Sequence, residues 1–199
     1  MKGSFFAVVL VVLALASFAF NEQPQRKQPD MVARGKYLVT VGGCNDCHTP
    51  KVFTQMGPTP DSTRLLSGHP AASTLPEIPQ NVLAPDKWGA LTTNDLTAWA
   101  GPWGVSFARN LTPDATTGLG SWTPEMFIKA LRTGKDMGEG RDILPPMPWP
   151  NFAQMSNQDL RAIFQYLRSL KPIENAVPDP ISPTGERLPT GKTGNISPK

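Results

Sequence analysis

The chain has 199 residues, and its 19 lysines and arginines against 16 aspartates and glutamates give a formal net charge of +3. So mild an excess gives no reason to expect a nucleic-acid partner or binding to an anionic membrane surface. The length suffices for one domain with a sizeable core, and the two cysteines lie in one short motif, which leaves none for a structural disulfide.

The chain begins with a segment typical of export signals. Lys2 supplies one positive charge, residues 5–20 are almost wholly apolar, and Ser17-Phe18-Ala19 offers the small residues that signal peptidase requires. We therefore predict a signal peptide over residues 1–19 and a polar linker over residues 20–29. An uncleaved membrane anchor is the alternative, although the apolar run is short against the roughly 20 residues of a membrane span.

A first helix is predicted to begin at Asp30, which is a suitable N-cap, and to end at Gly42-Gly43. Its partial apolar face consists of Val32, Tyr37, Leu38 and Val41. Tyr37 is accordingly expected to be a core residue.

The motif that follows, Cys44-Asn45-Asp46-Cys47-His48, has the C-x-x-C-H spacing of covalent c-type haem attachment. Residues three apart lie on one face of a helical turn, so both sulfurs can reach the same edge of a porphyrin. His48 directly follows the second cysteine and can ligate the iron through one imidazole nitrogen.

Two other chemistries use a C-x-x-C pair. A thioredoxin-like redox pair is expected in a βαβ context, which this sequence does not indicate. A structural zinc site needs four ligands, and His69 is the only further histidine or cysteine in the chain. Haem attachment is therefore the preferred interpretation.

Residues 49–109 form a long, proline-rich insert with little helical periodicity, and loops of this length are often functional. Short strands are indicated at residues 91–93 and 96–98, on either side of an Asn94-Asp95 turn, and in the alternating residues from Val105 to Arg109. Three tryptophans give the insert apolar mass and either pack it onto the domain or form a patch for a partner: Trp88, Trp99 and Trp103. His69 is either a solvated loop residue or a second axial ligand.

Helices are easier to predict after residue 122. Thr123-Pro124-Glu125 is a typical helix start, and Gly134 a typical end. Ser156 with Asp159 resembles a capping box, and the apolar residues that follow at helical spacing predict a helix that ends before Pro172. The tail, residues 173–199, is rich in Pro, Gly, Ser and Thr and is expected to be extended or disordered, or to wrap the domain or bind a partner.

Met147 lies between these helices, in Leu144-Pro145-Pro146-Met147-Pro148. Methionine usually serves as a flexible filler of cores, whereas prolines on both sides restrict this one. A fixed thioether is suited to a weak bond to haem iron on the side opposite His48. Met137 and Met155 are the competing candidates.

These segments together resemble the class I cytochromes c of bacteria, in particular monohaem subunits or carriers with a long loop after the haem motif. The similarity covers roughly residues 30–172. The matching segments are residues 34–38, 44–50, 110–114, 122–125, 144–148 and 159–170. The resemblance implies an all-α domain around one covalent haem c, with short β pieces in the insert and the first helix packed across the last.

Axial ligation by His48 and Met147 would leave no coordination site for a substrate, so the expected function is one-electron transfer rather than catalysis. The resemblance implies haem attachment in the periplasm and a dehydrogenase or terminal oxidase of a respiratory chain as redox partner. A membrane is expected as partner only if the N-terminal segment is retained. The alternative is a peroxidase-like haem enzyme or a sensor with an open distal position, for which His69 and Arg109 are the candidate distal residues.

Two further sets of contacts are expected around the haem. Arg109, Asn110 and Trp149 are candidate hydrogen-bond donors to the propionates. A backbone carbonyl should orient the second nitrogen of His48. The candidates for that carbonyl are Pro50, Pro58 and Pro102.

Overall fold

The computed structural model describes residues 30–79, 81–84 and 86–188. The predicted signal peptide (1–19) and linker (20–29) lie outside the described residues. Within the described part, no helix has the length and apolar character to cross a membrane. The division into leader, linker, domain and tail stays a prediction.

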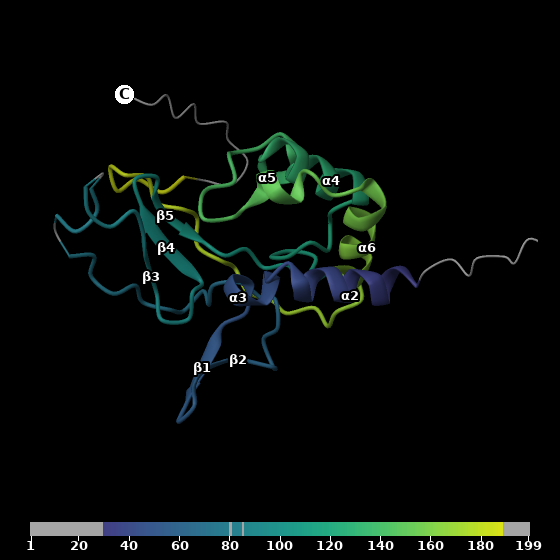
Figure 1. Ribbon diagram of the computed structural model, residues 1–199, viewed down its shortest axis with the longest axis horizontal. Helices are drawn as coiled ribbons and strands as arrows, with labels where there is room; N and C mark the ends of the chain where they lie inside the picture. Colours follow the sequence, from purple (N-terminus) through teal and green to yellow (C-terminus); the bar gives the residue numbers. More distant parts are fainter. Residues whose placement is uncertain (1–29, 80, 85, 189–199) are drawn as a thin grey trace, which may run out of the picture.

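Helices form one side of the molecule and short strands the other (Figure 1). The helices are α2 (Met31–Val41), α3 (Cys44–His48), α4 (Pro124–Thr133), the 3-10 turn η1 (Asp136–Gly138), α5 (Trp149–Phe152) and α6 (Asn157–Arg168). The strands are β1 (Lys51–Thr54), β2 (Gly57–Pro60), β3 (Leu91–Thr92), β4 (Ala98–Gly101) and β5 (Gly104–Phe107).

The predicted helix starts are confirmed by their capping bonds. Asp30 accepts from the backbone N–H of Val32 at 3.0 Å, Thr123 from that of Met126 at 3.2 Å, and Ser156 from that of Asp159 at 3.1 Å. These bonds satisfy N–H groups that have no partner inside the helix. Gly134 ends α4 with a positive φ of 67°, which glycine adopts without steric cost.

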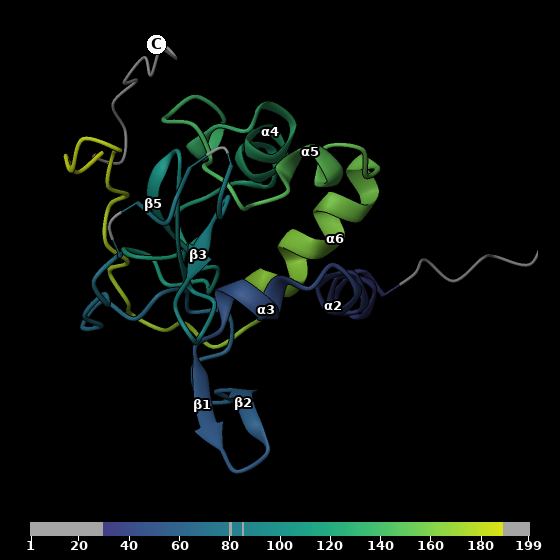
Figure 2. The same cartoon turned by 60° about the vertical axis from the view of Figure 1, so that its left-hand side comes forward.

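Helix α2 packs across α6, as predicted, and Gly35 makes the close approach possible (Figure 2). A Cβ on Gly35 would lie 2.0 Å from the carbonyl oxygen of Ala162. The buried residues of α2 are Gly35 and Val39. Of the predicted apolar face, Leu38 packs against the core, whereas Val32, Tyr37 and Val41 are exposed. Tyr37 is 63% exposed and is not a core residue.

The prediction of an all-α fold is wrong, because the insert forms two antiparallel sheets. In one, β4 pairs with β3 and β5, close to where the sequence indicated strands and a turn. In the other, β1 pairs with β2 around Gln55-Met56, and this hairpin projects from the body in both views (Figure 1 and Figure 2). Strand β2 was not predicted because it contains Pro58 and Pro60, and prolines within strands are largely confined to sheet edges.

The three tryptophans of the insert do not share one role. Trp99 and Trp103 are half-buried in the β4–β5 region, whereas Trp88 is 67% exposed. Packing of the insert therefore accounts for the first two and not for Trp88.

The described part of the tail, residues 173–188, wraps the domain. Asn175 donates to the carbonyl oxygens of Ser67 at 2.7 Å and His69 at 2.9 Å. Ile181 exchanges backbone hydrogen bonds with Val105 of β5. This segment thus connects the insert to the far end of α6.

Candidate haem-binding site

The C-x-x-C-H motif forms the single turn α3, which begins after Gly43 in the left-handed conformation (φ 65°). Cys44 and Cys47 are half-buried and are not joined in a disulfide. Cys44 packs against the main hydrophobic core, which includes Val39 of α2 and Leu160 of α6. The turn is therefore supported by the crossing of the first and last helices.

The thiols lack the character of a redox pair. Burial raises the pKa of Cys44 to about 11 and also raises that of Cys47, with the charge of Asp46 adding to the effect. Reactive cysteines of C-x-x-C redox motifs instead have lowered pKa values. This environment does not favour a thioredoxin-like function.

One nitrogen of the His48 ring is held by the protein. Its Nδ1 lies 2.7 Å from the carbonyl oxygen of Arg109, so Nδ1 carries the hydrogen and Nε2 presents its lone pair. Burial lowers the pKa of His48, which keeps the imidazole neutral, as a metal ligand must be. The expectation that Pro50, Pro58 or Pro102 supplies this carbonyl is wrong, because the acceptor belongs to a residue 61 positions further along the chain.

Met147 packs half-buried against the same core cluster as Cys44. Its segment is held by a hydrogen bond of 2.6 Å from Ser106 Oγ to the carbonyl oxygen of Pro145. The backbone N–H of Trp149 donates to the carbonyl oxygen of Met147 at 2.9 Å, which leads directly into α5. Met137, by contrast, lies 40% exposed in a left-handed turn.

Residues 106–109 therefore contact both sides of the predicted site: the ring of His48 and the segment that carries Met147. Ser106 holds the Met147 segment, and Arg109 holds the ring of His48. Three residues of extended chain span at most about 11 Å. Strand β5 and the two residues after it thus limit the distance between the Met147 segment and the His48 ring.

Buried hydrogen-bond donors test whether a haem fits here. In the described residues, Trp103 Nε1, Arg109 Nε and Arg141 Nε are buried and lack an acceptor. An unpaired buried donor costs about 1–3 kcal/mol, so such groups usually face an acceptor. The two carboxylates of a haem are acceptors of the required kind, so the chemistry of these donors is compatible with that group.

The three predicted propionate contacts differ in whether they have a free hydrogen-bond donor. Arg109 keeps an unpaired Nε. Asn110 donates both amide hydrogens elsewhere, to Thr117 Oγ1 at 3.1 Å and the carbonyl oxygen of Ile173 at 2.8 Å. The Trp149 ring packs directly against Gly134: a Cβ added at Gly134 would lie 2.4 Å from a ring carbon. The unpaired donors of Trp103 and Arg141 were not predicted from the sequence, because no motif surrounds either residue.

His69 is not a solvated loop residue. It is 1% exposed, its Nδ1 lies 2.8 Å from Thr97 Oγ1, and its ring is 4.9 Å from that of Phe107. Thr97 Oγ1 in turn donates to Asp95 at 2.8 Å, so it accepts from His69. The backbone N–H of His69 donates to the carbonyl oxygen of Ala108 at 2.9 Å, which ties this part of the insert to the end of the insert beside Arg109.

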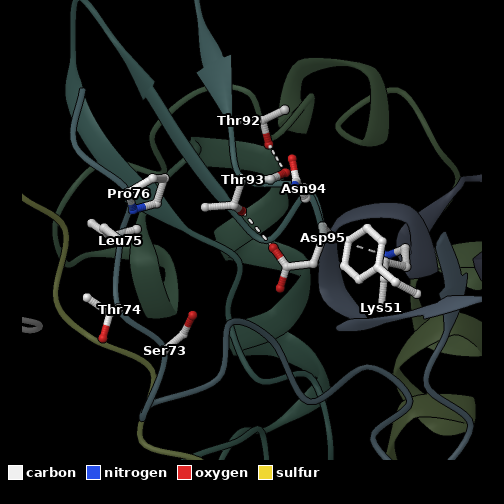
Figure 3. A pocket seen from close by; sticks show the side chains of 10 residues that line it. Lys51, Ser73, Thr74, Leu75, Pro76, Thr92, Thr93, Asn94 and Asp95 are labelled. Carbon is white, nitrogen blue, oxygen red and sulfur yellow. Dashed lines mark hydrogen bonds between the residues drawn. The ribbon is translucent and has the colours of Figure 1, made fainter. Parts of the chain in front are cut away.

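A separate hollow lies at the base of the projecting hairpin (Figure 3). Lys51 and Asp95 stand on one side of it, and Ser73 to Pro76 on the other. Lys51 Nζ donates to backbone carbonyls of Asp46 and Thr49 at 2.8 and 2.5 Å. The hollow does not include the predicted haem ligands, but this lysine connects it to the haem motif.

Comparison with known proteins finds relatives among cytochrome subunits, although no family model matches the chain. The chain is 29% identical over 180 residues to the gluconate 2-dehydrogenase cytochrome c subunit of Pantoea cypripedii, covering 90% of this chain and 31% of the relative. It is 31% identical over 166 residues to the cytochrome c subunit of the quinone alcohol dehydrogenase of Gluconobacter oxydans, covering 81% and 26%. These relatives support a c-type cytochrome.

A further relative is the diheme cytochrome c-type protein of Cereibacter sphaeroides, 24% identical over 180 residues, which covers 85% of this chain and 48% of that protein. The chain spans less than a third of the two dehydrogenase subunits above.

Proposed function

We propose that this chain is a monohaem class I cytochrome that carries single electrons for a dehydrogenase. The observation that carries the proposal is the His48 ring, with Nδ1 bonded to the Arg109 carbonyl and Nε2 left as a ligand. When bound, haem c supplies the Fe(III)/Fe(II) couple. Cys44 and Cys47 would hold the haem covalently, and His48 and Met147 would be the axial ligands.

The chain's own residues would keep the iron closed to substrates. Cys44 and Met147 pack against the same hydrophobic core, and the bond from Ser106 to Pro145 restrains the Met147 segment. Arg109 would donate to a propionate while its carbonyl orients His48. A single C-x-x-C-H motif supports one haem per chain.

The proposed partner is a dehydrogenase, because the relatives are cytochrome subunits of gluconate and alcohol dehydrogenases. We propose the periplasm as the location, on the basis of the signal-like residues 1–19. Retention of that segment would attach the protein to a membrane.

The test is carbon monoxide binding by the full chain, produced in cells with haem-maturation machinery. A carrier with two axial protein ligands should bind one haem per chain and show no spectral change when the ferrous form meets carbon monoxide. The matched control is Met147→Ala, which opens the distal position and should bind carbon monoxide readily. Rapid binding by the unmodified chain would contradict the carrier function and favour an enzyme or sensor.

A further inference from the structure

A partly buried ionic cluster is centred on the loop that connects α4 to the Met147 segment. Asp136, which is 4% exposed, accepts a hydrogen bond from Arg109 Nη1 through Oδ1. The backbone N–H of Asp136 donates to the carbonyl oxygen of Arg141 at 2.8 Å. One aspartate thus contacts the side chain of one arginine and the backbone of the other.

Further bonds close this loop around Asp136. The carbonyl oxygen of Asp136 accepts from Gly140 at 2.7 Å, and Ile143 donates to Gly134 at 2.7 Å. Lys135 and Asp142 pair across the outside of the loop at 2.7 Å. The loop is therefore a closed unit, and it presents Arg141 from a fixed backbone.

The two arginines have capacity that the protein does not use. Nε of Arg109 and Nε of Arg141 are both buried without an acceptor in the described part of the chain. Burial lowers the pKa of Arg141, and the like charge of Arg109 adds to that effect, whereas the charges of Asp136 and Asp179 oppose it. The Arg109 guanidinium is further fixed by stacking 5.0 Å above the ring of Trp122.

We infer that Arg141 joins Arg109 in a clamp for the haem propionates, and that Asp136 is the residue that positions both arginines. The inference rests on the proposed haem function and extends it to two residues that lie outside every recognised motif. Carboxylates are the acceptors that guanidinium groups bind best. Arg109 connects the clamp to the proposed iron ligand, because its backbone carbonyl accepts a hydrogen bond from His48.

Such a cluster should affect the reduction potential with a predictable sign. A cation near the iron disfavours the ferric form, which carries one more positive charge, and an anion favours it. Loss of Arg141 should therefore lower the potential, whereas loss of the Asp136 charge should raise it. Mere loosening of the site, by admitting water, would shift both variants in the same direction.

The experiment is a redox titration of the haem-loaded full chain and three variants, Arg141→Gln, Asp136→Asn and Arg161→Gln. Arg161 pairs with Glu125 on the exposed faces of α6 and α4, so its variant removes the same charge away from the cluster. For Arg141→Gln we expect the ferric-to-ferrous equilibrium to shift by on the order of tenfold, which is about 59 mV for one electron. Asp136→Asn should shift it in the opposite direction, and Arg161→Gln should leave it nearly unchanged.

Resonance Raman spectroscopy gives a second readout, since the propionate bending band reports hydrogen bonding to that group. The band should move in Arg141→Gln and not in Arg161→Gln. If Arg141→Gln does not mature, Arg141→Lys keeps the charge but not the fork of donors, and should move the band with a smaller change of potential.

Two results would overturn the inference separately from the proposed function. A haem-loaded Arg141 variant with the potential and Raman band of Arg161→Gln would remove Arg141 from the clamp while leaving the cytochrome function intact. Shifts of equal sign in Arg141→Gln and Asp136→Asn would reduce the cluster to a structural role. Absence of haem from the unmodified chain would refute the proposed function itself.

Discussion

The crossing of α2 and α6 at Gly35 can be tested with one methyl group. In Gly35→Ala the new Cβ would lie 2.0 Å from the carbonyl oxygen of Ala162, 2.6 Å from its carbonyl carbon and 2.7 Å from the Cβ of Tyr166. A comfortable carbon–oxygen contact is about 3.3 Å or more, so the helices must separate by more than about 1 Å. Backbone atoms obstruct the methyl, and they cannot turn away as a flexible side chain would.

The expected cost follows from two opposing effects. Overpacking a tight core costs about 1–3 kcal/mol and occasionally more, and a clash with backbone belongs at the upper end. Alanine in a helix gains about 1 kcal/mol over glycine. We therefore expect Gly35→Ala to lower the free energy of unfolding by about 2 kcal/mol.

The assay is urea unfolding of the haem-loaded full chain, followed by circular dichroism. Gly89→Ala is the control, because a Cβ at Gly89 has no heavy atom within 4 Å. That variant should stay within about 0.5 kcal/mol of the unmodified chain. If Gly35→Ala is as stable as the unmodified chain, or more stable, helix propensity prevails and the close crossing is refuted.

Three further predictions concern the bonds that hold the site. Asn110→Ala should lower the free energy of unfolding by about 1–3 kcal/mol, because it leaves the Thr112 N–H without its buried acceptor, while the Ile173 carbonyl keeps only its longer bond from Thr112 Oγ1 at 3.3 Å; urea unfolding measures this, and a loss below about 0.5 kcal/mol would contradict it. Ser106→Ala removes the bond to Pro145 and should weaken Met147 ligation by about 0.5–1.5 kcal/mol, seen as earlier loss of the sulfur-to-iron band in urea; an unchanged midpoint would disprove the restraint. Arg34→Gln removes the hydrogen bond and charge that lower the pKa of Asp159, a partner at 2.6 Å. Because that carboxylate stabilises the fold above its unfolded pKa of about 3.9, the variant should be slightly less stable than the unmodified chain at pH 7. The difference should close as the pH falls through the lower, folded pKa, and a difference that widens in acid would have the wrong sign.

Local signals predicted the helical part of the fold well. Helices α2, α4 and α6 are each capped by a side chain that bonds to a backbone N–H three positions further along the chain, as seen for Asp30, Thr123 and Ser156. The capping residue and its partner therefore lie within the same few residues of sequence. The haem motif is equally local, since it occupies one turn. The strands at β3 to β5 were indicated near their observed positions for the same reason.

Contacts between distant segments set the limit of sequence prediction. Any residue can offer a carbonyl, so nothing in the composition of the insert marked Arg109 as the partner of His48. Tyr37 looked like a core residue because apolar character alone defined the helix face, whereas the close crossing selected Gly35 and Val39. Asp136 and Arg141 lie in an ordinary polar loop, and only the fold brings their cluster to Arg109.

The most direct test of the haem assignment is the near-infrared spectrum of the ferric full chain. Ligation by His48 and Met147 predicts a sulfur-to-iron charge-transfer band that disappears in Met147→Ala and persists in Met137→Ala and Met155→Ala. Absence of the band from the unmodified chain, or its survival in Met147→Ala, would contradict the proposed ligand set and the electron-carrier function that depends on it.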